Sequence, residues 1–346
     1  MLVDNPILKE DLEYVASQIS SLGFKNSIFF ITGATGLVGS LFSMSILYAN
    51  DKYALGNKVI AHVRDKSKAE SIFRSSSSLD YSVGDIRSGI DYDGSVDYII
   101  HAASETKSKN MVSSPVETLL TTIEGTKNTL DFALNKKVKA FVYISSMEAF
   151  GDVDKQGRAK EEDLGYIDLT KARSSYPEGK RAAENMCCCY AHEYGVPVTV
   201  ARLAQTFGAG VGKGDTRVFA QFARSVLENK DIVLHSLGKS CGNYVYTADA
   251  LTSLFLLLKK GERANIYTVC NEESSMSIKE MADMVSSSVA GNKIKVVFDI
   301  PDDADKFGYA PDVRLRLDSS KLRSLGWKPC YSLKDSYIRL LEYWKN

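Results

Sequence analysis

The sequence IFFITGATGLVG, residues 28–39, decides the fold of this chain. Its first four residues are all apolar, which is typical of a strand buried on both faces of a parallel sheet. A glycine-rich turn follows, and apolar side chains then recur at helical spacing from Leu41 to Leu47. A tight glycine turn between a strand and a helix lets a pyrophosphate approach the backbone and the free N–H groups of the helix N-terminus. The stretch therefore predicts a dinucleotide-binding turn made of Gly33, Thr35, Gly36, Leu37, Val38 and Gly39.

Strand-like and helix-like segments alternate after this turn. Short apolar runs at 59–63, 98–100, 141–144 and 198–201 predict strands, and the stretches 116–134 and 174–194 predict helices. This alternation predicts the fold class α/β, with a Rossmann-type doubly wound parallel sheet. Beyond Phe207 the pattern is less regular, with helices expected at 218–228, 248–259 and 277–288. That part predicts a smaller C-terminal α/β lobe that binds substrate.

The chain divides into three predicted parts. Residues 1–26 form an N-terminal helical extension, residues 27–207 the dinucleotide-binding domain, and residues 208–346 mainly the substrate lobe, interleaved with the sheet. The extension is expected to be helical because Pro6 suits a first turn and Gly23 supplies a stop. Between them, apolar side chains recur every three or four positions, at Leu8, Leu12, Val15, Ile19 and Leu22. This apolar face is expected to pack on the core or on a second subunit.

Composition excludes several classes of protein. The 346 residues carry 43 Lys and Arg against 43 Asp and Glu, so net charge gives no reason to expect nucleic acid or an anionic membrane as a partner. No apolar run approaches the ~20 residues that span a bilayer, and the acidic N-terminal region predicts no signal peptide. Three of the six cysteines are adjacent and none has metal-ligand spacing. We therefore expect reduced thiols, no metal site and a cytoplasmic location.

The end of the second predicted strand bears on the choice of cofactor. An acidic residue there would bind the adenosine ribose of NAD, whereas an arginine would accommodate the 2′-phosphate of NADP. The chain has Arg64 followed directly by Asp65, with Lys66 and Lys68 beyond. Arg64 favours NADP over NAD by a small margin, and both cofactors stay open.

Several further motifs stand in order along the chain: His101–Ser104, Ile144–Ser146 with Phe150 and Gly151, and Tyr176–Lys180. Together with the glycine turn they resemble the extended short-chain dehydrogenase/reductases. The likeness is to their NAD-dependent epimerase/dehydratase family, in the branch of UDP-glucuronate decarboxylases and 4,6-dehydratases. It continues through residues 202–208, 244–249 and 318–327. The resemblance implies an enzyme that modifies a nucleotide sugar, a lyase or an isomerase, commonly a homodimer paired through helices such as 116–134 and 174–194.

The resemblance also implies catalytic roles that the chemistry of the residues supports. Tyr176 would remove the proton from a sugar hydroxyl as hydride leaves the same carbon, and Ser146 would hold that oxygen. A free tyrosine titrates near pH ~10, so it needs a neighbouring cation to act near neutrality. Lys180 lies four residues later, on the same helical face, and is expected to favour the phenolate and to bind the nicotinamide ribose.

Glu148 is the fourth catalytic candidate. In the similar dehydratases an acid precedes this glutamate and protonates the leaving hydroxyl, but here Met147 occupies that position. Methionine cannot donate a proton, which disfavours 4,6-dehydration. A decarboxylation needs no such acid, because the C4 ketone accepts the electrons that carbon dioxide leaves behind. The alternative for Glu148 is a solvated loop carboxylate.

The resemblance assigns further binding residues. For the cofactor they are Asp85, Ile86, Ala102 and Ala103, besides Arg64, Tyr176, Lys180 and the glycine turn. For the substrate they are Ser104, Gln205, Arg217, Tyr244 and Arg314, with Arg316 as an alternative to Arg314. The arginine that often clamps the diphosphate in this family is replaced here by Gly242.

These observations favour an enzyme that acts through a transient 4-keto sugar, with decarboxylation, 4,6-dehydration and 4-epimerisation as open outcomes. The main alternative is an NADPH-dependent carbonyl reductase with a substrate that lacks a nucleotide. A non-catalytic dinucleotide sensor is a weaker alternative, because a sensor needs the glycine turn but not the set Ser146, Tyr176 and Lys180.

Overall fold

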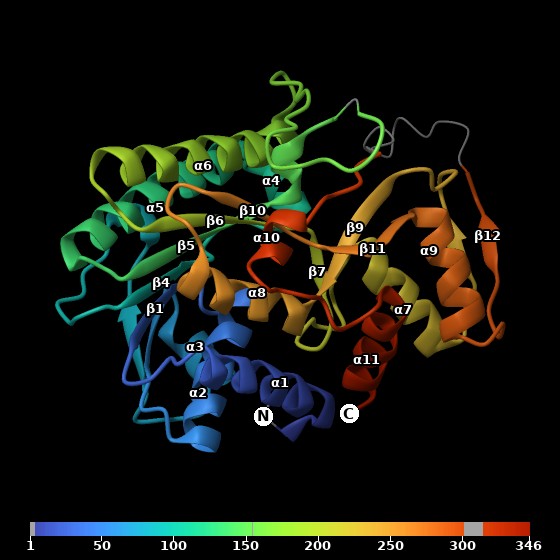
Figure 1. Cartoon of the computed structure of the whole chain (residues 1–346). Helices are drawn as coiled ribbons and strands as arrows, with labels where there is room; N and C mark the ends of the chain where they lie inside the picture. Colours follow the sequence, from blue (N-terminus) through green and yellow to red (C-terminus); the bar gives the residue numbers. More distant parts are fainter. Residues whose placement is uncertain (1–3, 154, 301–313) are drawn as a thin grey trace.

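The computed structural model describes residues 4–153, 155–300 and 314–346. A seven-stranded parallel sheet forms its centre (Figure 1), in the order β10-β6-β5-β4-β1-β2-β3. The strands are β1 (Ile28–Thr32), β2 (Lys58–Val63), β3 (Leu79–Val83), β4 (Tyr98–His101), β5 (Ala140–Ser146), β6 (Val198–Leu203) and β10 (Ile266–Val269). This is the predicted doubly wound sheet. The strand order reverses at β1, whose neighbours are β2 and β4, so a crevice opens at the carboxyl ends of β1 and β4.

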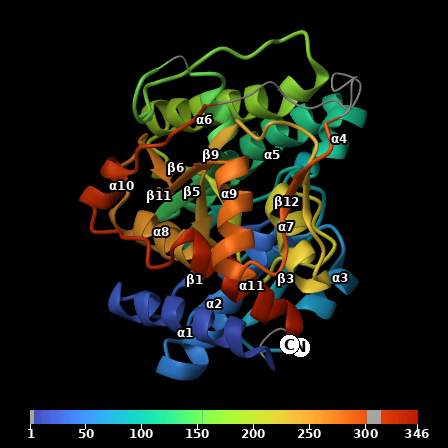
Figure 2. The same ribbon diagram turned by 90° about the vertical axis from the view of Figure 1, so that its right-hand side faces the viewer.

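Helices cover both faces of the sheet (Figures 1 and 2). The helices α5 (Pro115–Lys136) and α6 (Ser175–Glu193) pack together on one face, over a core that includes Phe30, Phe132 and Tyr143. On the other face lie α2 (Leu37–Tyr53) and α8 (Thr247–Lys260), over a core that includes Phe29, Phe42 and Phe255. Three further helices are short: α3 (Lys66–Ile72), α4 (Ser108–Ser113) and α10 (Ser320–Ser324).

The N-terminal extension is the helix α1 (Pro6–Ser21), as predicted, and it packs within the same chain. Asn5 caps it by accepting hydrogen bonds from two backbone N–H groups, and Gly23, with a φ of +72°, follows its end. The apolar face of α1 lies against α2, α8 and the C-terminal helix α11 (Leu333–Lys345). The two ends of the chain therefore lie side by side (Figures 1 and 2).

A smaller lobe follows the main sheet in sequence. It contains the three-stranded sheet β11-β9-β7 and the parallel pair β12-β8. Its strands are β7 (Gln205–Phe207), β8 (Ile232–Leu234), β9 (Cys241–Tyr246), β11 (Asn271–Ser277) and β12 (Val296–Phe298), and its helices are α7 (Val218–Glu228), α9 (Ile278–Met284) and α11. A separate core of Phe207, Phe219, Tyr337 and Trp344 holds it together. Since β10 and α8 come after residue 208 but belong to the large sheet layer, the two parts interleave along the chain.

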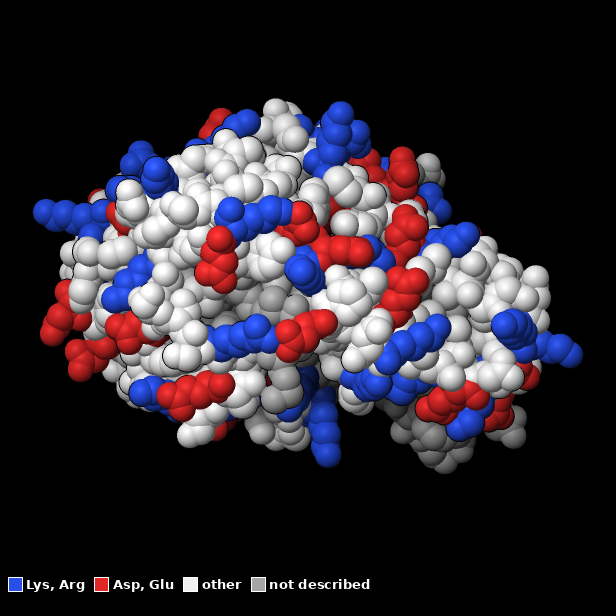
Figure 3. All heavy atoms as spheres, turned by 90° about the horizontal axis from the view of Figure 1, so that it is seen from below, with Lys and Arg blue, Asp and Glu red and all other residues white. Residues whose placement is uncertain are grey.

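The structure contains elements that were not expected: both edge strands of the main sheet, β3 and β10, the five strands of the smaller lobe and the helix α11. The edge strand β3 was not predicted, because its residues are only partly buried and show no apolar run. The helix expected at 277–288 ends at Met284 and continues as a π-helical turn, Val285–Val289. On the face seen from below Figure 1, positive and negative side chains are interspersed (Figure 3), as the balanced composition leads one to expect.

Candidate active site

The glycine turn between β1 and α2 is closely packed. A Cβ atom on Gly33, which has a φ of +64°, would come within 2.7 Å of the backbone of Ala102 and Ala103. A Cβ atom on Gly39 would lie 2.4 Å from the carbonyl oxygen of Gly33. The N-cap of α2 is Gly36, so no side chain blocks the first N–H groups of the helix. This end of α2 can therefore receive an anion such as a pyrophosphate.

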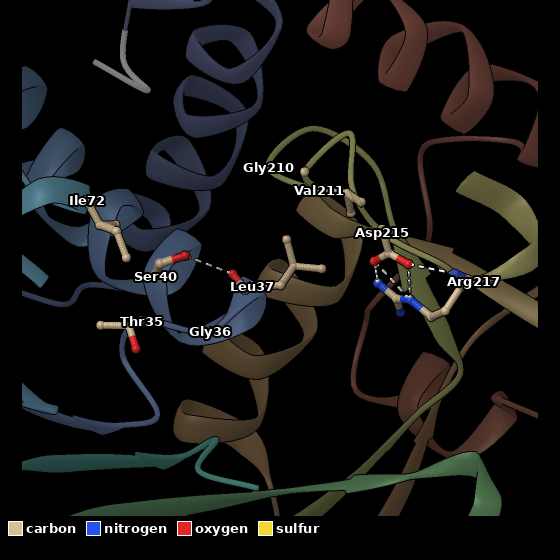
Figure 4. A pocket seen from close by; sticks show the side chains of 10 residues that line it. Thr35, Gly36, Leu37, Ser40, Ile72, Gly210, Val211, Asp215 and Arg217 are labelled. Carbon is tan, nitrogen blue, oxygen red and sulfur yellow. Dashed lines mark hydrogen bonds and ion pairs between the residues drawn. The ribbon is translucent and has the colours of Figure 1, made fainter. Parts of the chain in front are cut away.

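A cavity of about 300 Å³ opens beside this turn (Figure 4). One side is formed by the start of α2 together with Ile72 of α3, and the other by the segment 210–217. The lining residues are Thr35, Gly36, Leu37, Ser40, Ile72, Gly210, Val211, Gly212, Asp215 and Arg217. Arg217 is held by Asp215, with its Nη2 atom 2.7 Å from a carboxylate oxygen. The cavity thus has a helix N-terminus on one side and a guanidinium group on the other, both suited to phosphates.

A buried histidine holds the end of β4 against the turn. His101 hydrogen-bonds the Thr32 hydroxyl at 2.6 Å and the Thr126 hydroxyl at 3.2 Å. The Thr32 hydroxyl also accepts from the N–H of Ala103. Burial lowers the pKa of His101 to about 3, helped by the charges of Lys180 and His62, so this ring is neutral. The network places Ala102 and Ala103 directly against Gly33, as the cofactor prediction requires.

Ser146, Tyr176 and Lys180 come together at the carboxyl end of β5. Ser146 is the last residue of β5, and the other two lie one turn apart on α6. Lys180 is buried and donates a hydrogen bond of 2.8 Å to the carbonyl of Ile144. Its Nζ atom lies 5.8 Å from the centre of the Tyr176 ring and 4.8 Å from that of Tyr143. The spacing in sequence therefore produces the expected juxtaposition in space.

The electrostatics of this group differ from the expectation that Lys180 lowers the pKa of the phenol. Burial and the charge of Glu148 raise the pKa of Tyr176 to about 12, although a hydrogen bond with Ser146 and the charges of Arg173 and Arg217 lower it. Burial also lowers the pKa of Lys180 to about 8, while Glu184 acts in the opposite direction. In the ligand-free protein the phenol is protonated at neutral pH.

Glu148 is partly exposed, and its carboxylate is ion-paired. It forms an ion pair of 2.8 Å with Arg173, and its N–H donates to the Ser146 hydroxyl. The guanidinium carbon of Arg173 lies 5.6 Å from the centre of the Tyr176 ring. Arg173 was not predicted from the sequence; its position three residues before Tyr176, in the turn that leads into α6, was the available signal. A second ion pair, between Glu184 and Arg202 at 2.7 Å, is almost fully buried behind Lys180 and anchors α6 to β6.

The residues expected to choose between NAD and NADP lie at the surface. Arg64 is exposed just beyond β2, whereas Asp65 caps α3 by accepting from the N–H of Lys68. Asp85 caps the next turn by accepting from the N–H of Arg87. Ile86 is buried, and a Cβ atom on Gly125 of α5 would lie 3.0 Å from it.

The structure brings only some of the expected substrate residues to the cavity. Arg217 is the one that lines it. Ser104 is not part of the lining, and its buried hydroxyl has no hydrogen-bond partner among the described residues. Gln205 is half-buried at the start of β7, paired through its backbone with Tyr244. The ring of Tyr244 packs in the core of the smaller lobe, 5.9 Å from Phe207, and not on the cavity lining.

The predicted Arg314 is also absent from the cavity lining. Arg314 is exposed, and its backbone pairs with Cys241. Its neighbour Arg316 lines a second cavity, of about 420 Å³, together with Arg158 and Glu272. Sequence reasoning missed the segment 210–212, although glycine at every second position from Gly208 to Gly214 marks it as a close-packed loop.

Two further features of the described residues concern metal binding and the membrane. Within residues 4–153, 155–300 and 314–346, no three His, Cys, Asp or Glu side chains are grouped so that they could hold a metal ion. The same part of the chain contains no helix that is both long and apolar enough to cross a bilayer. Cys187, Cys188, Cys189, Cys270 and Cys330 form no disulfide.

Two enzymes of known name are similar to this chain in sequence. UDP-glucuronic acid decarboxylase 1 of Xenopus tropicalis is 30% identical over 252 residues, which are 72% of this chain and 57% of the relative. The dTDP-D-glucose 4,6-dehydratase of Dictyostelium discoideum is 22% identical over 283 residues, 72% of this chain and 65% of the relative. The chain thus matches little more than half the length of the decarboxylase.

Solved structures of similar fold cover almost the whole chain. The epimerase Mth375 of Methanothermobacter thermautotrophicus has a TM-score of 0.77 at 21% identity, over 97% of this chain and 95% of its own. The UDP-glucose 4-epimerase of Thermotoga maritima, solved with UDP-glucose, has a TM-score of 0.76 at 21% identity, over 92% and 98%. These similarities establish the fold. A sequence model described as "NAD dependent epimerase/dehydratase family" matches residues 29–270, and the chain belongs to that family.

Proposed function

We propose that this protein oxidises a nucleotide-linked uronic acid at C4 and decarboxylates it, as a UDP-glucuronate decarboxylase does. The observation that carries the proposal is the convergence of Ser146, Lys180 and Glu148 on the buried phenol of Tyr176. The names of the relatives support a nucleotide sugar over the free ketone of a carbonyl reductase.

The residues of the turn fit a dinucleotide. A Cβ atom on Gly33 or Gly39 would collide with neighbouring backbone, so only glycine allows a turn this tight, and Gly36 leaves the start of α2 uncapped. Ala102 and Ala103, held by His101, would form the neighbouring wall. When bound there, a nicotinamide dinucleotide would supply the acceptor for the hydride.

Tyr176 would act as the base in the first step. The Ser146 hydroxyl holds the C4 oxygen of the sugar, and the phenolate takes the C4 hydroxyl proton while hydride leaves C4. The charges of Arg173 and Arg217 favour the phenolate, because both lower the pKa of Tyr176. Lys180, fixed by the carbonyl of Ile144, would bind the ribose of the nicotinamide.

The second step follows from the ketone. A carboxylate on C5 of the 4-keto sugar is a β-keto acid, so its C–C bond breaks, carbon dioxide leaves and the electron pair passes into the C4 carbonyl. A proton from solvent would convert the enolate at C5 into the 4-keto pentose. Tyr176 would then give its proton back to the C4 oxygen, and a bound cofactor would supply the hydride for C4, which yields a nucleotide pentose. Met147 cannot supply the acid that elimination of a hydroxyl requires, so we place decarboxylation ahead of 4,6-dehydration. We place it ahead of 4-epimerisation because the relatives that are 30–31% identical are named as decarboxylases.

We propose NADP ahead of NAD as the preferred cofactor. The exposed guanidinium of Arg64 is available for a 2′-phosphate, whereas the Asp65 carboxylate already caps α3. We also propose a cytoplasmic homodimer that pairs through α5 and α6; the five thiols of Cys187, Cys188, Cys189, Cys270 and Cys330, which form no disulfide, are consistent with the cytoplasm. Light scattering of the purified protein tests the oligomeric state.

The test of the activity is incubation with UDP-glucuronate and either NAD+ or NADP+, followed by mass spectrometry. The proposal predicts a UDP-pentose and one carbon dioxide per substrate, with little net reduction of the cofactor. UDP-glucose and dTDP-glucose serve as controls. Turnover of a control but not of UDP-glucuronate would contradict decarboxylation, and stoichiometric NADPH consumption with a free ketone would support the carbonyl reductase instead.

A further inference from the structure

The loop Gly208–Gly212 forms one wall of the cavity. The side of the loop that faces away from the cavity packs on Tyr246, which both terminal helices hold in place, and on Trp344 of α11. Gly210, Val211 and Gly212 line the cavity across from the start of α2 (Figure 4). Gly210 packs closely on Leu41 of α2, since a Cβ atom at this position would lie 2.9 Å from the Leu41 side chain. The contacts on the other side of the loop help to set its position and with it the width of the cavity.

Tyr246 supports the first half of the loop. A Cβ atom on Gly208 would lie only 2.3 Å from the Tyr246 ring, which is 1% exposed. The neighbouring Thr247 hydroxyl donates a hydrogen bond of 3.2 Å to the carbonyl of Ala209. The backbone of the loop thus lies directly on the ring.

Trp344 supports the second half. Its indole N–H donates a hydrogen bond of 2.7 Å to the carbonyl of Val211, and the side chain is 2% exposed. Trp344 belongs to the last turn of α11, so a residue two positions before the last one in the sequence binds a residue that lines the cavity.

The Tyr246 hydroxyl is in turn fixed by both terminal helices. It donates a hydrogen bond of 2.6 Å to Asp11 of α1 and accepts one of 3.1 Å from Arg339 of α11. Arg339 also binds Asp11 at 2.7 Å and Glu10 at 3.0 Å. Tyr246, Asp11 and Arg339 are thus all hydrogen-bonded to one another. This network holds the Tyr246 ring in one position.

We propose that α1 and α11 form a clasp that positions the cavity wall, with Tyr246 and Trp344 as positioning residues. This inference rests on the proposed function, because it assumes that the cavity receives the phosphates of the cofactor or of the nucleotide sugar. Neither residue touches the ligand. Each acts through the backbone of the loop, and Asp11 and Arg339 act through Tyr246.

The test compares binding of NAD+ and of UDP by four variants that each remove one polar group. Trp344→Phe and Tyr246→Phe remove groups of the clasp. Their controls are Trp327→Phe, whose equally buried indole donates to Asp249, and Tyr337→Phe, whose buried hydroxyl has no hydrogen-bond partner among the described residues. We expect the dissociation constant of at least one ligand to rise about 5-fold in each clasp variant, equivalent to ~1 kcal/mol, and to stay within a factor of two in the controls.

Fluorescence adds a readout that simple loss of stability would not change. The chain has only two tryptophans, so Trp344 is the sole indole in Trp327→Phe. We expect saturating ligand to change the emission of Trp327→Phe and to leave that of Trp344→Phe unchanged. Equal affinities in clasp and control variants, with no change in Trp344 emission, would overturn the inference. A wild-type protein that binds neither NAD+ nor UDP would instead contradict the proposed function.

Discussion

The guanidinium of Arg173 is paired with the carboxylate of Glu148 at 2.8 Å, next to the ring of Tyr176. Both charges act on the phenol, in opposite directions: Glu148 raises the pKa of Tyr176 and Arg173 lowers it. The pair therefore affects the proton affinity of the proposed base. Glu148 lies in the turn after β5, and Arg173 lies in the turn before α6.

Exchange of either member should shift the pH dependence of catalysis in a defined direction. A base must be deprotonated, so kcat/KM rises as the pH passes through the pKa of the phenol. Arg173→Gln should move that rise to higher pH and lower kcat/KM at pH 7 roughly tenfold, since ~1.4 kcal/mol corresponds to a factor of ten. Glu148→Gln should move the rise to lower pH. Shifts in the same direction, or none, would argue that the pair does not tune Tyr176.

The glycine turn offers a test of cofactor binding that does not depend on the substrate. Gly39→Ala places a Cβ atom 2.4 Å from the carbonyl of Gly33, so the backbone must move. We expect the dissociation constant for the dinucleotide to rise at least ~10-fold, with a loss of about 1–3 kcal/mol in the free energy of unfolding. The matched control is Gly242→Ala, since a Cβ atom there meets nothing within 4 Å. Unchanged binding by Gly39→Ala would remove the turn from the site.

Arg64 should decide between the two dinucleotides. Arg64→Ala should weaken NADP+ binding roughly tenfold and leave NAD+ binding almost unchanged, because only NADP+ carries the 2′-phosphate. Lys68→Ala, an exposed cation in the helix that follows, serves as the control. Calorimetric titration with both dinucleotides provides the measurement. A wild-type preference for NAD+, unaffected by Arg64→Ala, would show that Arg64 plays no part in the choice.

The buried Asp11 should make the stability of the clasp depend on pH. Burial raises the pKa of Asp11 to about 6, from 3.8 in an unfolded chain. Between these values the native state binds more protons than the unfolded state, so the contribution of Asp11 is complete below pH ~4 and is lost as the pH rises through ~6. Asp11→Asn cannot ionise and escapes this loss.

Chemical denaturation of wild type and Asp11→Asn at a series of pH values tests this sign. The free energy of unfolding of the wild type, relative to the variant, should fall as the pH rises from 4 to 7. Asp249, whose pKa burial also raises to about 6, is present in both proteins and largely cancels in the difference. A relative stability that is constant or rises with pH would contradict the account of Asp11.

Much of the fold follows from the sequence because the decisive elements carry strong local signals. The strands β1, β2, β4, β5 and β6 are buried on both faces and therefore read as apolar runs. The edge strand β3 lacks that signal, since Asp80 and Val83 face solvent. The contacts between α1 and α11 could not be predicted from the sequence either, because Asp11 and Arg339 are separated by more than 300 residues.

The candidate site likewise contains residues that the sequence predicts and residues that it does not predict. Ser146, Tyr176 and Lys180 were predictable because a strand end and one helical turn bring them together. Arg173 was not, since its role depends on how the turn before α6 folds back on Glu148. Tyr244 shows the opposite failure: its position in a motif suggested substrate binding, but its ring is part of the core of the smaller lobe.

The most direct test of the account is the effect of Tyr176→Phe on turnover of UDP-glucuronate, with Tyr194→Phe, at the exposed end of the same helix, as the control. The account predicts that kcat falls by ~10²–10⁴ while the dissociation constant for the dinucleotide changes less than threefold, because only the proton-transferring hydroxyl is lost. A Tyr176→Phe protein that forms the UDP-pentose at the wild-type rate would show that another group removes the C4 proton.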